Sequence, residues 1–111
     1  MAGILTLKIV EGKLTRNTEL FGNIDPFIQI EYRDQKFRTK VNDGGGLNPT
    51  WNETFIIPIV SVEELLIIVC KDKDLLIDDF IGKTEVEVQE LCAKEIKRKW
   101  ISLFCDGTKS G

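Results

Sequence analysis

The sequence contains no histidine, and only three of its 111 residues are cysteines. The missing histidine excludes histidine general bases, Ser-His and Cys-His nucleophile pairs, and most zinc sites. Cys70, Cys92 and Cys105 are odd in number, widely spaced and without a CxxC motif, which argues against a disulfide framework. We therefore expect a cytoplasmic protein with reduced thiols that is not an enzyme.

Long apolar runs and an excess of basic residues are also missing. No run approaches the roughly 20 apolar residues that span a bilayer, and charge appears too early in the N-terminal segment for a signal-peptide core. The formal net charge of -3 argues against nucleic acid as a partner, and against a membrane bound by basic residues alone. If this chain meets an anionic surface, something must reverse its local charge.

The remaining composition is typical of one folded domain. Hydrophobic residues make up 42% and charged residues 30% of a chain whose length suits a single core. We expect one monomeric domain with a core over residues 3–105 and a frayed tail over residues 106–111.

Short segments with period-two hydrophobicity or strand-forming residues predict an all-β fold. Seven such segments are 5–9, 28–33, 36–41, 51–58, 65–71, 80–88 and 100–104. Seven or eight short strands of this kind favour an antiparallel sandwich.

The segments between these strands and the expected core complete the prediction. Asp34 and Gln35 suit a tight hairpin, the segment 42–49 is a loop rich in glycine, and 88–99 could form a short helix that includes Leu91. The expected core includes three aromatic residues and one thiol, namely Trp51, Phe55, Trp100 and Cys70.

Two predicted loops are unusually acidic: residues 18–26, the first acidic loop, and residues 71–80, the second acidic loop. Alternation aims Asp72 and Asp74 to the same side of the chain, which like-charge repulsion disfavours. A cation would relieve that repulsion, and calcium takes six to eight oxygen ligands in the irregular geometry that loops offer. The alternative is that these acids are solvated surface or turn-forming residues.

Four motifs, in this order along the chain, resemble those of the C2 domain family. They are Gly22-Asn23-Ile24-Asp25-Pro26-Phe27, Asn48-Pro49-Thr50-Trp51-Asn52-Glu53, Asp72-Lys73-Asp74 and Asp79-Phe80-Ile81-Gly82. The chain is most similar to small, free-standing C2 proteins of plants, with the phospholipase-like strand permutation. The resemblance implies an eight-stranded antiparallel Greek-key β-sandwich with one short helix near the C-terminus.

By this resemblance, five acids from the two loops would bind calcium, namely Glu19, Asp25, Asp72, Asp74 and Asp79. Glu19 stands where the family usually has aspartate. Asp78 could substitute for Asp79, because the span after Asp74 is one residue shorter than usual. Five carboxylates and two calcium ions leave a local charge of about -1 and unfilled coordination positions for lipid oxygens. The implied function is calcium-dependent binding to anionic phospholipid membranes, with peripheral recruitment of the protein from the cytoplasm.

Apolar residues between the acids would insert into the membrane interface. They are Leu20, Phe21, Leu75, Leu76 and Ile77. Packing on the rim of the sandwich is the alternative, above all for Phe21 and Ile77.

A basic strand is a second candidate for lipid contact. Lys36, Arg38 and Lys40 alternate on one face and could contact lipid headgroups, although such residues usually serve as soluble edge protection. A rival hypothesis is a calcium-independent C2 module that binds a protein partner, supported by Glu19 and by the short second acidic loop.

Overall fold

The computed structural model describes residues 3–16, 23–92 and 99–111 of the chain. In these residues the structure is built from strands and one helix of a single turn, listed here in chain order: β1 (Gly3–Glu11), β2 (Pro26–Tyr32), β3 (Gln35–Arg38), β4 (Thr50–Ile59), β5 (Leu65–Asp72), β6 (Asp79–Glu87), α1 (Val88–Leu91), β7 (Phe104–Cys105) and β8 (Thr108–Lys109). The prediction of an all-β fold with one short helix is confirmed.

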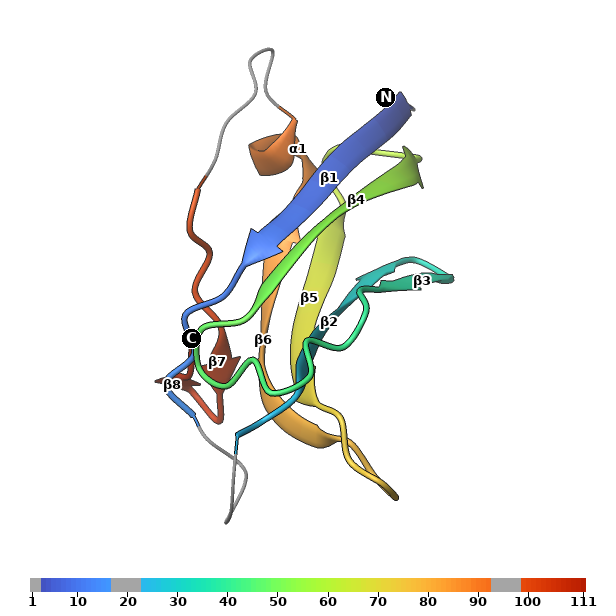
Figure 1. Ribbon diagram of the computed structural model, residues 1–111. Coiled ribbons are helices and arrows are strands. Elements are labelled where there is room, and N and C mark those ends of the chain that lie inside the picture. The colour runs from blue at the N-terminus through green and yellow to red at the C-terminus, as the bar shows by residue number, and fades with distance from the viewer. Residues whose placement is uncertain (1–2, 17–22, 93–98) are drawn as a thin grey trace.

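The strands form two sheets that face each other (Figure 1). β1 pairs with β4 in a two-stranded sheet, and the other sheet has the order β3-β2-β5-β6-β7-β8. Every strand pair is antiparallel. After β1 the chain crosses to the six-stranded sheet for β2 and β3, and then returns to place β4 beside β1. This crossover is the Greek-key connection that the resemblance to the C2 family implies.

The core lies between the sheets because alternate residues of each strand point inward. Leu5, Ile57 and Ile59 from the two-stranded sheet meet Ile28, Ile30, Tyr32, Leu66, Ile68 and Cys70 from the other. Cys70 is fully buried, as predicted, whereas Trp51 and Phe55 are partly buried against the cluster. The prediction that Trp100 belongs to the core is wrong: it is 61% exposed.

The hairpin between β2 and β3 turns one residue earlier than the sequence predicts. Tyr32 pairs with Gln35, so that Arg33 and Asp34 form the turn. This register places Ile30 opposite Phe37 and keeps both side chains on the core side. The burial of these two side chains outweighs the cost of a positive φ of 53° at Arg33. β3 also ends at Arg38, short of the predicted end at residue 41.

The prediction of a frayed tail over residues 106–111 is wrong. β7 and β8 form a hairpin around Asp106 and Gly107, both of which have positive φ. Ser110 is buried, and the backbone N–H of Ser110 donates to the carbonyl of Leu103 at 2.8 Å. Asp-Gly is a strong signal for a two-residue hairpin turn, so these residues were recoverable from the sequence.

The C-terminal strand and helix differ from their predicted bounds. Strand pairing near residues 100–104 is confined to β7, which starts only at Phe104. α1 covers Val88–Leu91 of the predicted helix 88–99, and Leu91 packs against the core as expected. Residues 93–98 of that prediction lie outside the described residues.

A hydrogen-bond network fixes the end of the sandwich where β2 finishes and β5 starts. The buried Tyr32 hydroxyl accepts the backbone N–H of Val60 at 2.8 Å and of Ser61 at 3.3 Å, and it donates to Glu64 at 2.9 Å. Arg33 also contacts both carboxylate oxygens of Glu64, at 2.7 and 3.0 Å. The hydrogen bonds from Arg33 lower the pKa of Glu64, and the one from Tyr32 adds to this effect.

Tyr32→Phe is expected to lower the free energy of unfolding by about 1–3 kcal/mol, because two N–H groups lose their buried acceptor while the ring still fills its site. Urea unfolding followed by fluorescence measures this change. Arg33→Gln, which removes only an exposed ion pair, should cost less than about 1 kcal/mol. Equal losses in the two variants would contradict a special role for the tyrosine hydroxyl.

Candidate functional site

Three of the predicted acids lie in one row at the opposite end of the sandwich. Asp25 immediately precedes β2, Asp72 ends β5 and Asp79 begins β6. In the strand register Asp72 pairs with Pro26 on one side and with Asp79 on the other. Antiparallel pairing therefore brings together acids that are separated by as many as 54 residues, from 25 to 79, in the sequence.

The backbone at this end is cross-linked through the acids themselves. The N–H of Asp25 donates to Oδ1 of Asp72 at 2.8 Å, and the N–H of Lys73 donates to the carbonyl of Asp25 at 3.0 Å. Asp72 is fully buried. These bonds hold the start of β2 against the end of β5, so the position of Asp72 is set by the fold.

The glycine-rich loop over residues 42–46 also reaches this site, which the sequence did not predict. The N–H of Gly44, which has a φ of +67°, donates to Oδ1 of Asp25 at 2.7 Å. The N–H of Gly46 donates to the carbonyl of Ile24 at 3.1 Å. Asp43 immediately precedes Gly44 in the sequence, and it is exposed. The loop therefore brings a further carboxylate close to Asp25. No local pattern around Asp43 indicates that proximity.

The second acidic loop is organised by its own carboxylates. Oδ1 of Asp74 accepts the N–H of Leu75 at 2.7 Å, and Oδ1 of Asp78 accepts the N–H of Asp74 at 3.1 Å. The ammonium of Lys73 lies 3.5 Å from the same Asp78 oxygen. The backbone hydrogen bond and Lys73 lower the pKa of Asp78. The carboxylate of Asp78 therefore links the two ends of this loop through the N–H of Asp74. That Asp78 could replace Asp79 as a calcium ligand stays a prediction.

The tip of this loop is highly exposed. Leu75, Leu76 and Ile77 are 99%, 95% and 80% exposed. Three neighbouring apolar side chains in water are costly, and the alternative that Ile77 packs on the rim of the sandwich is wrong. Glu19, Leu20 and Phe21, predicted from the first acidic loop, lie outside the described residues.

The donor chemistry of this end suits a hard cation such as calcium, which prefers carboxylate oxygens. However, within residues 3–16, 23–92 and 99–111 no three acidic, histidine or cysteine side chains are grouped closely enough to hold a metal ion. The backbone brings Asp25, Asp72 and Asp79 into one row, but the described side chains do not form a finished metal site.

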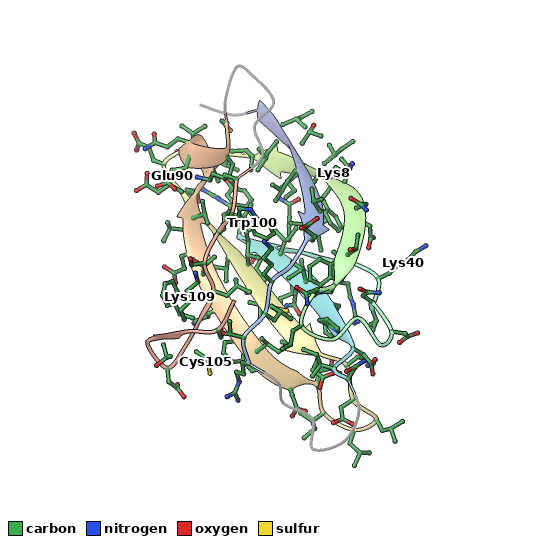
Figure 2. The ribbon with its side chains drawn as sticks, turned by 60° about the vertical axis from the view of Figure 1, so that its left-hand side comes forward. Lys8, Lys40, Glu90, Trp100, Cys105 and Lys109 are labelled. Atoms are coloured by element: carbon green, nitrogen blue, oxygen red, sulfur yellow. The ribbon has the colours of Figure 1, made fainter. Side chains whose placement is uncertain are left out.

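The basic residues separate into two kinds of position. Lys36 and Arg38 share the outer face of β3: Lys36 lies 3.9 Å from a Glu31 oxygen, and the Arg38 guanidinium lies 4.2 Å from the centre of the Phe27 ring. Lys40 lies beyond the end of β3, and its side chain extends away from the sandwich (Figure 2). Only two of the three predicted residues therefore lie on the strand.

Cys70 lies under the acidic row, two residues before Asp72. Burial, with a smaller contribution from the charge of Asp72, raises the pKa of this thiol to about 12. Cys92 is exposed and Cys105 is partly buried, and all three cysteines are free thiols.

We expect Cys70 not to react with Ellman's reagent in the native protein at pH 8, where about one in ten thousand such thiols is ionised. Cys92 should react first, and Cys70 only after unfolding. The measurement is the time course of thiol release with and without denaturant, and Cys92→Ser should remove the fast phase. Simultaneous reaction of all three thiols in the native protein would contradict the burial of Cys70.

The fold and the motifs at this end define a C2 domain. The family model for the C2 domain matches residues 3–103, and the chain belongs to this family. A similar protein is the 16 kDa phloem protein 1 of Arabidopsis thaliana, 33% identical over 102 residues. That alignment covers 86% of this chain and 65% of the phloem protein, so this chain spans about two thirds of that relative's length.

Two solved structures are similar over nearly the whole chain. The C2A domain of plant extended synaptotagmin 1 has a TM-score of 0.85 at 24% identity and covers 97% of this chain and 87% of that chain. Human GIVD cytosolic phospholipase A2 has a TM-score of 0.80 at 27% identity and covers 96% of this chain and 15% of that one. Both agree with the predicted sandwich.

Proposed function

We propose that this domain binds anionic phospholipid membranes in the presence of calcium, through the end of the sandwich that presents Asp25, Asp72 and Asp79. The observation that best supports this proposal is the pairing of an acidic row with an exposed apolar tip. Leu75, Leu76 and Ile77 project directly beyond the strand ends that bear the acids. Charge reversal by an ion and burial of apolar side chains can then act on the same bilayer.

In this proposal Asp25, Asp72, Asp74 and Asp79 are the ligands from the described residues, and Glu19 would complete the set. Bound calcium would supply positive charge and open coordination positions for lipid phosphate oxygens. The residues of the chain hold these ligands in place, since the N–H of Asp25 and the fold fix Asp72. Lys36 and Arg38 on β3 are a second proposed contact with headgroups.

A domain of this kind is recruited peripherally, and catalysis is not part of the proposal. Within the described residues, the structure contains no helix that is both long and apolar enough to cross a bilayer.

Cosedimentation with vesicles of phosphatidylserine and phosphatidylcholine, with calcium and with chelator, tests the proposal. Binding should require both calcium and the anionic lipid. Binding that is equal in chelator would favour a calcium-independent domain, and no binding to any vesicle would favour the rival function of a protein-binding module. The ion pair that Asp78 makes with Lys73 is the observation that favours this rival, because it occupies the acid that could substitute for Asp79 as a ligand.

A further inference from the structure

The glycine-rich loop over residues 42–46, in the connection from β3 to β4, runs beside the start of β2 (Figure 1). The backbone N–H of Asn42 donates to the carbonyl of Pro26 at 2.9 Å. At the other end of the loop, the N–H of Gly46 donates to the carbonyl of Ile24 at 3.1 Å. These two bonds hold both ends of the loop against the short segment that precedes and begins β2.

The middle of the loop bonds to a side chain of that segment. The N–H of Gly44 donates to Oδ1 of Asp25 at 2.7 Å. A carboxylate offers about four lone-pair positions, so one N–H orients the group and leaves it able to accept a cation. Asp25 is partly exposed, and its own N–H donates to Oδ1 of Asp72 at 2.8 Å. The loop, Asp25 and Asp72 are therefore linked in series.

The conformation of the loop accounts for its three consecutive glycines. Gly44 and Gly46 have φ values of +67° and +63°, a region that most side chains disfavour. A Cβ at Gly45 would collide with the side chain of Asn42, whose Oδ1 accepts the N–H of Thr50 at 2.9 Å. The backbone path of the loop therefore presents the N–H to the carboxylate.

We propose that the N–H of Gly44 positions Asp25 for calcium, so that the loop over residues 42–46 sets the calcium affinity of a site to which it gives no ligand. This inference rests on the proposed function, in which Asp25 is a ligand. A carboxylate that is already oriented loses less rotational freedom when an ion binds. Hydrogen-bonding partners that orient metal ligands typically contribute about 10- to 100-fold in metal affinity.

Gly44→Val tests the proposal, because a β-branched side chain at a φ of +67° forces the loop to change its path. Isothermal titration with calcium, without lipid, should show an affinity about 10- to 100-fold below that of the natural sequence. Gly44→Asn should stay within about twofold of the natural sequence, since asparagine tolerates a positive φ and keeps the N–H in place.

Gly107→Val is the matched control for backbone strain. Gly107 has a φ of +81°, and at Gly107, as at Gly44, no heavy atom of the described residues lies within 4 Å of an added Cβ. It lies in the turn between β7 and β8, and β5 and β6 separate these strands from β2 in the sheet. This variant should lose a similar amount of stability in thermal unfolding with chelator, and it should keep the calcium affinity of the natural sequence.

Hydrogen exchange by NMR in chelator gives a readout that does not depend on calcium. The amide of Gly44 belongs to an exposed residue, so slow exchange there reports its hydrogen bond. Asp25→Ala should accelerate this exchange, and Gly107→Val should not. Equal exchange rates at Gly44 in Asp25→Ala and in the natural sequence would overturn the proposal.

Asp43→Asn separates the backbone N–H from the charge of the neighbouring carboxylate. Asparagine keeps the path of the loop, and an exposed charge is screened at physiological salt, so the calcium affinity should change less than about threefold. A loss as large as that of Gly44→Val would make Asp43 itself a ligand and would overturn the positioning role of the loop.

The outcomes also distinguish this inference from the proposed function. If the natural sequence and Gly44→Val bind calcium equally well, the loop does not position Asp25, and the proposed function stands. If Gly107→Val loses as much affinity as Gly44→Val, the loss is a general effect of strain and the inference fails. A natural sequence that binds no calcium overturns both.

Discussion

Replacing Asp74 and Asp79 together by asparagine is expected to abolish the stabilisation of the domain by calcium. An ion that binds only the native state adds about 2.7 kcal/mol to the free energy of unfolding at a hundredfold excess over its Kd. For a domain of this size that is a rise of roughly 10 °C in Tm. Asparagine keeps the shape of both side chains but removes two negative charges from the proposed ligands. Thermal unfolding in millimolar calcium and in chelator measures the difference.

These two positions are preferable to Asp72, whose buried carboxylate accepts the N–H of Asp25 and so contributes to the fold. Glu63→Gln with Glu85→Gln is the matched control, because it removes two exposed acids from other parts of the surface. The control should keep the full calcium effect. If the Asp74 and Asp79 variant retains it too, these acids are not ligands. A large loss of stability in chelator would instead mean that they hold the loop.

Leu75→Ala with Leu76→Ala is expected to weaken calcium-dependent vesicle binding about 10- to 100-fold. Full burial of each leucine is worth about 1.5–3 kcal/mol, and each 1.4 kcal/mol is about a factor of ten in affinity. Partial insertion of the two leucine side chains is therefore enough to account for a change of about 10- to 100-fold in affinity. Calcium affinity measured without lipid should stay nearly constant, because the alanines leave every carboxylate in place. The measurement is cosedimentation with anionic vesicles at saturating calcium across a salt series.

Salt separates the two parts of the interaction. Screening weakens exposed charge contacts much more than apolar burial, so the leucine variant should be more salt-sensitive than the natural sequence. Ile4→Ala with Ile56→Ala is the matched control, since both side chains are exposed and apolar but lie on the sheet of β1 and β4. Identical binding curves for the leucine variant and the natural sequence would show that the tips do not enter the bilayer.

The strands that face the core were predictable because their alternation is a local property of the sequence. β2 and β5 have strongly buried inward faces, and their predicted segments differ from the observed bounds by two residues at most. The turn at Arg33 was not predictable from its own residues. The pairing of Ile30 with Phe37 decides that register, and this pairing depends on a core assembled from distant strands.

Composition misled the prediction at the C-terminus. The usual burial of tryptophan predicts that Trp100 lies in the core, but it is 61% exposed and the ammonium of Lys13 lies 4.8 Å from the centre of its ring. The position of residues 106–111 predicts a tail, although the Asp-Gly pair in this segment forms a tight turn. Gly82 adds a contact that no local pattern reveals, since a Cβ there would collide with the Ser110 side chain. The last residues thus pack against the start of β6.

The sequence motifs identify the acids of the candidate site, but they do not predict the residues to which these acids are hydrogen-bonded. The sequence places Asp72 and Asp79 at the ends of two strands, and the register makes them a pair. The contact between Asp25 and the N–H of Gly44 joins segments whose proximity depends on the whole sandwich. The hydrogen bond from Asp74 to Asp78 depends on the exact path of a short loop. Sequence patterns therefore found the type of site and missed its internal bonding.

The network around Tyr32 lies at the end of the sandwich remote from the acidic row, and this separation makes the domain a natural scaffold for grafting. Tyr32, Val60 and Glu64 tie three strand ends together without any residue of the second acidic loop. Residues 73–78 could then be exchanged for a foreign recognition loop, provided that Asp72 and Asp79 still pair at its base. Libraries built on this loop should tolerate wide sequence variation, because the Tyr32 network and the hydrogen bond from the N–H of Asp25 to Asp72 both lie outside its side chains.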